Sequence, residues 1–77
     1  MKDMMDIILN AQVKQAEAMI LKHKVNIEVL TKNASGVAEH PDIMDTVEKE
    51  LAQIAHWQDI IDATSQLDFH QKKTLVE

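Results

Sequence analysis

The stretch "NASGVAEHPDIMD", residues 33–45, decides the fold, because it holds the only glycine and the only proline among 77 residues. Gly36 suits the left-handed position that closes a helix, and Val37 is the hydrophobic residue that often follows and packs back on it. Pro41 suits the first turn of a new helix, where its missing N–H costs nothing, and this register makes His40 the N-cap. A stop signal and a start signal so close together predict a helical hairpin.

The segment before this turn, residues 4–34, contains no glycine or proline, which predicts one long helix. Asp3 is a suitable N-cap, and Asp6 adds a second carboxylate at the positive end of the helix dipole. The apolar residues form two stripes at helical spacing. The first stripe comprises Met5, Ile8, Leu9, Val13, Ala16, Ile20, Ile27 and Leu30. The second comprises Met4, Ile7, Ala11, Ala18, Leu21, Val25 and Val29. One stripe is enough for one partner helix, so the second predicts another partner.

The segment after the turn, residues 41–65, predicts a second helix. Its core stripe is Ile43, Val47, Leu51, Ile54, Trp57 and Ile61. Residues 2–33 carry a net charge of +1 and residues 37–66 a net charge of −6, which favours two helices lying side by side. Residues 1–66 therefore form the predicted hairpin, and residues 67–77 are a tail or a short third helix.

Composition limits the remaining choices to a small all-α domain that associates with something. A chain of this size buries only about 60% of its unfolded surface, and the absence of cysteine excludes disulfides and thiolate metal sites. We therefore predict an antiparallel two-helix hairpin that dimerises into a four-helix bundle.

Charge and hydropathy exclude several classes of partner. The net charge is −5, and all eight basic residues are lysine, so nucleic-acid binding is not expected. No stretch resembles a signal peptide or a membrane span. We therefore expect a protein of the cytoplasm, of a host cell or of a virion, neither secreted nor membrane-bound.

Three candidate sites come from the histidines. His56 and Asp59 share a helix face with Asp62, which would suit a metal-dependent enzyme, but no third strong ligand is available and a solvated polar face is favoured. His23 is expected to lie beside a hydrophobic seam as a snorkelling side chain. His40 could titrate near neutral pH and alter the turn, although a structural cap is favoured. We therefore expect no catalytic set, metal or cofactor, and no enzyme.

Residues 36–62, "GVAEHPDIMDTVEKELAQIAHWQDIID", resemble small uncharacterised helical-hairpin proteins of tailed bacteriophages, in particular marine and T4-like ones. This resemblance implies a virion component or accessory factor and carries no site residues across. The predicted function is a non-enzymatic structural module that binds itself and an unidentified protein assembly. The alternative is a small acidic protein that inhibits a partner enzyme through its negative second helix. The expected interface residues are Ile20, Val25, Ile27, Leu30, Val47, Leu51, Ile54, Trp57 and Ile61.

Overall fold

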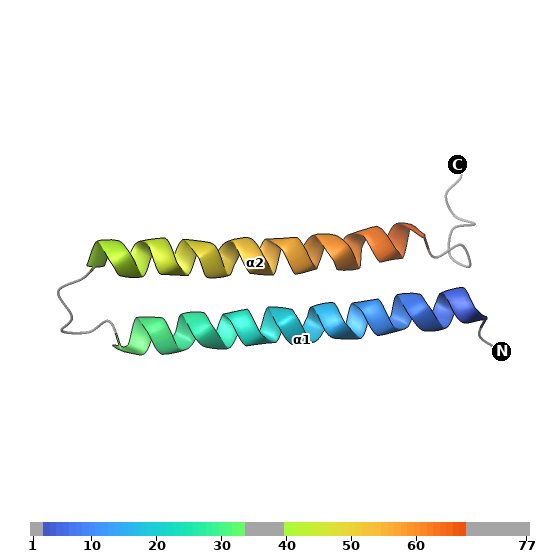
Figure 1. Ribbon diagram of the computed structural model, residues 1–77, viewed down its shortest axis with the longest axis horizontal. Coiled ribbons are helices and arrows are strands. Elements are labelled where there is room, and N and C mark those ends of the chain that lie inside the picture. The colour runs from blue at the N-terminus through green and yellow to red at the C-terminus, as the bar shows by residue number, and fades with distance from the viewer. Residues whose placement is uncertain (1–2, 34–39, 68–77) are drawn as a thin grey trace.

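The protein is a helical hairpin in the computed structural model, which describes residues 3–33 and 40–67. Helix α1 runs over Met4–Asn33 and helix α2 over His40–Gln66, and the two pack antiparallel along their length (Figure 1). The predicted all-α hairpin is confirmed, and each predicted helix boundary lies within one residue of the observed one. The predicted roles of Gly36 and Val37, and the tail after residue 67, lie outside the described residues.

The ends of the helices follow from their capping residues. The Asp3 carboxylate accepts a hydrogen bond from the Asp6 backbone N–H at 2.9 Å, so the predicted N-cap of α1 is confirmed. Helix α2 begins at His40, which places His40 inside the helix and corrects its predicted position before the first turn. Pro41 lies in that first turn as expected. The Leu67 N–H donates to the Thr64 carbonyl at 3.0 Å, which closes α2 in a turn.

Each helix presents one seam of covered residues to the other, spaced three and four residues apart. In α1 the seam comprises Leu9, Val13, Ala16, Ile20, His23, Ile27 and Leu30. In α2 it comprises Ile43, Val47, Glu50, Ile54, Trp57, Ile61 and Thr64. Ala16 is the only fully buried hydrophobic residue in the described part of the chain. The hairpin alone therefore encloses very little apolar surface.

The seam of α2 differs from the predicted stripe at one position. Leu51 is 53% exposed, and Glu50 occupies the covered position in its place. The prediction was wrong here because positions 50 and 51 both fit helical spacing between Val47 and Ile54. Hydrophobicity favoured Leu51 over Glu50. A contact with His23 on α1 decides for Glu50.

The contact between His23 and Glu50 also fixes which residues face each other. Because the helices are antiparallel, the residue seven positions before His23 in α1 lies opposite the residue seven positions after Glu50 in α2. Ala16 therefore lies opposite Trp57. The smallest side chain of the seam faces the largest, which explains why Ala16 is left with no exposed surface.

Candidate functional site

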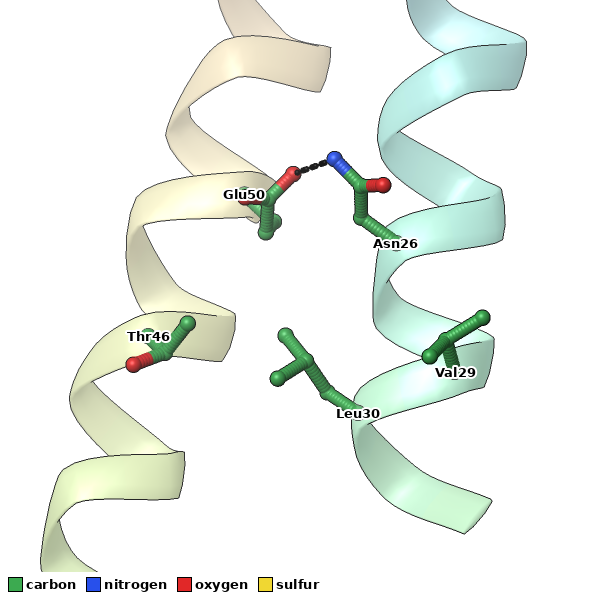
Figure 2. A pocket seen from close by; sticks show the side chains of 5 residues that line it. All are labelled: Asn26, Val29, Leu30, Thr46 and Glu50. Atoms are coloured by element: carbon green, nitrogen blue, oxygen red, sulfur yellow. Dashed lines mark hydrogen bonds between the residues drawn. The ribbon is translucent and has the colours of Figure 1, made fainter. Parts of the chain in front are cut away.

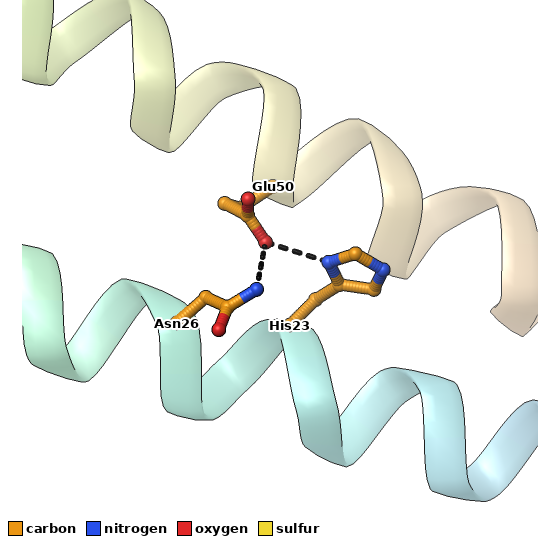
Figure 3. A network of polar contacts seen from close by, with 3 residues as sticks. All are labelled: His23, Asn26 and Glu50. Carbon is orange, nitrogen blue, oxygen red and sulfur yellow. Dashed lines mark hydrogen bonds and ion pairs between the residues drawn. The ribbon is translucent and has the colours of Figure 1, made fainter.

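A cluster of three polar side chains interrupts the apolar seam near the middle of the hairpin (Figure 3). His23 and Asn26 lie one turn apart on α1 and both reach the same oxygen of Glu50 on α2. The Nδ1 atom of His23 lies 2.6 Å from Glu50 Oε1, and the Asn26 amide donates to that oxygen at 3.0 Å. We call these three residues the polar cluster.

The electrostatics of the polar cluster favour an ionised Glu50. Hydrogen bonds donated by His23 and by Asn26 lower the pKa of the Glu50 carboxyl from its ordinary value of 4.5. Glu50 is therefore a carboxylate at neutral pH. Because a carboxylate only accepts hydrogen bonds, the Nδ1 atom of His23 must carry the proton in this contact.

The polar cluster is only partly satisfied. The Nε2 atom of His23, a residue that is 8% exposed, is buried without a hydrogen-bond partner among the described residues, and so is the Nε1 atom of Trp57. A buried polar atom without a partner costs about 1–3 kcal/mol. The cluster therefore contributes specificity more than stability, because a slip of one heptad would place His23 and Glu50 against apolar side chains.

A pocket opens beside the polar cluster, towards the turn end of the hairpin (Figure 2). It has a volume of about 290 Å³. Asn26, Val29 and Leu30 line it from α1, and Thr46 and Glu50 line it from α2. The pocket therefore combines aliphatic groups with the Glu50 carboxylate and the Asn26 amide, while the Thr46 hydroxyl donates to the Asp42 carbonyl at 2.8 Å and turns its methyl group towards the pocket (Figure 2). Its size suits one side chain of a partner better than a cofactor, since cofactor pockets are commonly larger.

The second apolar stripe of α1 lies on the surface. All seven of its residues are exposed, and Leu21 is 62% exposed. Two ion pairs run along α1 at exposed positions, between Lys14 and Glu17 at 3.7 Å and between Lys32 and Glu28 at 3.4 Å. We call this stripe the outer face of α1; it points away from α2 except at Val29, which also borders the pocket.

The nine predicted interface residues fall into three groups. Val25 lies on the outer face of α1, and Leu51 is exposed on α2. The other seven are half-buried in the seam: Ile20, Ile27, Leu30, Val47, Ile54, Trp57 and Ile61. Their contact with a second protein stays a prediction.

The polar cluster was not predicted from the sequence. His23 was expected to be a snorkelling side chain, and this was wrong because its ring is buried between the helices. A signal was present, since the first stripe steps seven residues from Ile20 to Ile27 and His23 fills the intervening position.

The other candidate sites gain no support from the structure. Among the described residues, no three histidine, aspartate or glutamate side chains are grouped to hold a metal ion. The His56 ring instead packs edge-on against Trp57, with centroids 4.9 Å apart. Neither described helix offers a window long and apolar enough to cross a membrane. Nothing is described for the His40 side chain, so its predicted switch stays a prediction.

Comparison with protein-family models, with curated proteins and with solved structures finds no match for this chain. The resemblance of residues 36–62 to phage hairpin proteins therefore stays a prediction.

Proposed function

We propose that this protein is a non-enzymatic interaction module, a helical hairpin that self-associates and docks on a larger protein assembly. One observation carries the proposal: the described residues include ten large hydrophobic side chains that are exposed and none that is fully buried, and Ala16 is the only buried hydrophobic residue among them. A hairpin of this kind gains stability when a partner covers that surface.

The outer face of α1 supports the docking part of the proposal. Its apolar residues extend from Met4 to Val29, over most of the helix. Lys14 interrupts this stripe between Ala11 and Ala18. A stripe of exposed apolar side chains along a helix is typical of a surface that receives another helix. A phage virion is one assembly that such a module would join, and the resemblance of residues 36–62 favours it.

The experiment that tests self-association is the molar mass of the purified chain by light scattering across a dilution series, with circular dichroism on the same samples. We expect a helical dimer that loses helicity as it dissociates. A helical monomer at every concentration would refute self-association, and the exposed surface would then belong to a different protein.

The second candidate is an acidic regulator that binds the basic surface of an enzyme. It is favoured by the exposed acidic side chains of α2: Asp42, Asp45, Glu48, Asp59 and Asp62. The test is to reverse the charge at Glu48, Asp59 and Asp62 and to compare the proteins captured by this variant with those captured by the native chain. Loss of a captured protein with unchanged helicity would support the regulator, and an unchanged set of captured proteins would refute it.

A further inference from the structure

One of the two flat faces of the hairpin carries no charge on the residues that flank the seam. Asn26 and Thr46 both line the pocket, so their helix rows lie on the same side of the hairpin. Steps of seven residues along each helix extend these rows. The rows are Met5, Gln12, Met19 and Asn26 on α1, and Thr46, Gln53, Ile60 and Leu67 on α2. We call this set the uncharged face.

The opposite flat face differs in charge and in burial. Its rows are Asn10, Glu17, Lys24 and Thr31 on α1, and Met44, Leu51, Gln58 and Ser65 on α2. It includes two charged residues, and all eight of its residues are exposed. On the uncharged face, by contrast, Met19, Asn26 and Ile60 are already half-buried. Missing charge and abundant methionine are typical of the core of a protein–protein interface.

The uncharged face has an open pocket towards one end and exposed apolar side chains at the other. The pocket (Figure 2) lies towards the end where α1 finishes and α2 begins. At the other end, Met5 is 39% exposed and Leu67 is 47% exposed. A surface with an open pocket towards one end and exposed apolar side chains at the other can receive a second copy of itself turned end over end.

The positions of the pocket and of Met5 and Leu67 fix where a two-fold axis would lie. On α1, the midpoint between Met5 and residues 26–30 falls at residue 16 or 17. On α2, the midpoint between residues 46–50 and Leu67 falls at residue 57 or 58. The register of the seam places Ala16 opposite Trp57. Both midpoints therefore lie in the same layer of the hairpin, as one axis requires.

We propose that a second copy of this chain packs on the uncharged face, turned end over end, with α1 antiparallel to α1 and α2 antiparallel to α2. The Met5 and Leu67 side chains of each copy then lie at the pocket of the other, and Met19 and Ile60 pack near the two-fold axis. This inference rests on the proposed self-association and specifies its surface. It leaves the outer face of α1 open for the larger assembly.

The first test places a charge on the uncharged face without disturbing the monomer. Gln53→Lys adds a lysine near the two-fold axis at an exposed position. Gln58→Lys is the matched control, because it makes the same change at an exposed position of the same helix on the opposite face. Glutamine and lysine have nearly equal helix propensity, so neither variant should change helicity. We expect Gln53→Lys to raise the dissociation constant of the dimer by a factor on the order of a hundred, since each copy then buries a lysine charge without a partner on the uncharged face. We expect Gln58→Lys to leave it unchanged.

The outcomes separate the two proposals. A native chain that is monomeric at every concentration refutes self-association itself. A native dimer that is unaffected by Gln53→Lys, or that is weakened equally by Gln58→Lys, refutes the uncharged face and leaves self-association standing. Dissociation caused only by Gln53→Lys supports both.

The second test traps the predicted neighbours, which is simple because the chain has no cysteine of its own. A Met5→Cys, Val29→Cys double variant should form a covalent dimer with a short bis-maleimide. A bridge within one copy is excluded, because 24 residues of straight helix span about 36 Å. The control is the Met5→Cys, Leu51→Cys variant, whose second cysteine lies on the opposite face. Equal cross-linking of both variants, or of neither, would overturn the proposal.

Discussion

The substitution Ala16→Leu should destabilise the hairpin more than any other exchange of alanine for leucine in α1. Ala16 has no exposed surface and lies opposite Trp57, so the three added carbon atoms have no free volume to enter. Overpacking of this kind costs about 1–3 kcal/mol. Because 1 kcal/mol shifts the Tm of a domain of 60–100 residues by about 4–8 °C, a loss of about 2 kcal/mol should lower Tm by roughly 8–16 °C.

The control is Ala18→Leu, two residues further along the same helix, where the side chain is exposed. Surface exchanges of this kind usually change the free energy of unfolding by less than about 0.5 kcal/mol. The assay is urea and thermal unfolding of both variants by circular dichroism, at one protein concentration because dimerisation makes stability concentration-dependent. Fluorescence of Trp57, the only tryptophan, should shift to the red in Ala16→Leu as the ring is displaced towards water.

Equal stability of Ala16→Leu and Ala18→Leu would refute the reasoning. It would show that the layer of Ala16 and Trp57 is not closed, and therefore that the register set by His23 and Glu50 is wrong.

Four further predictions concern the polar cluster and the candidate metal site at His56 and Asp59. The lowered pKa of Glu50 contributes stability that is fully present above its ordinary value of 4.5 and is lost as pH falls through the lowered native value. Glu50→Gln lacks this contribution. The urea midpoint of the native chain should therefore fall more steeply in acid than the midpoint of Glu50→Gln. Asn26→Ala, which removes one of the two donors, should reduce that pH dependence, and an unchanged slope would contradict the assigned cause. The double variant His23→Leu, Glu50→Leu should be at least as stable as the native chain while each single variant is less stable, and a double-mutant cycle without coupling would contradict this. Equilibrium dialysis with zinc should show no stoichiometric binding, and binding that His56→Ala or Asp59→Ala abolishes would restore the metal hypothesis.

The sequence by itself determined the two helices and the hairpin that they form. This part was predictable because its causes are local. Without glycine or proline, residues 4–33 have no reason to leave the helix, and the Asp3 side chain satisfies the first free N–H groups. Pro41 permits a new helix to start but could not continue an old one. The charge difference between the two segments favoured two helices lying side by side, as they do.

Only the tertiary structure decided which residues fill the seam. Glu50 and Leu51 both fit helical spacing, and hydrophobicity alone favours Leu51. The choice depends on His23, which lies 27 positions earlier in the chain and meets Glu50 only after the helices have packed. A carboxylate enters an apolar seam when a donor on the opposite helix offsets the loss of its hydration, and helical periodicity within one segment carries no information about that donor.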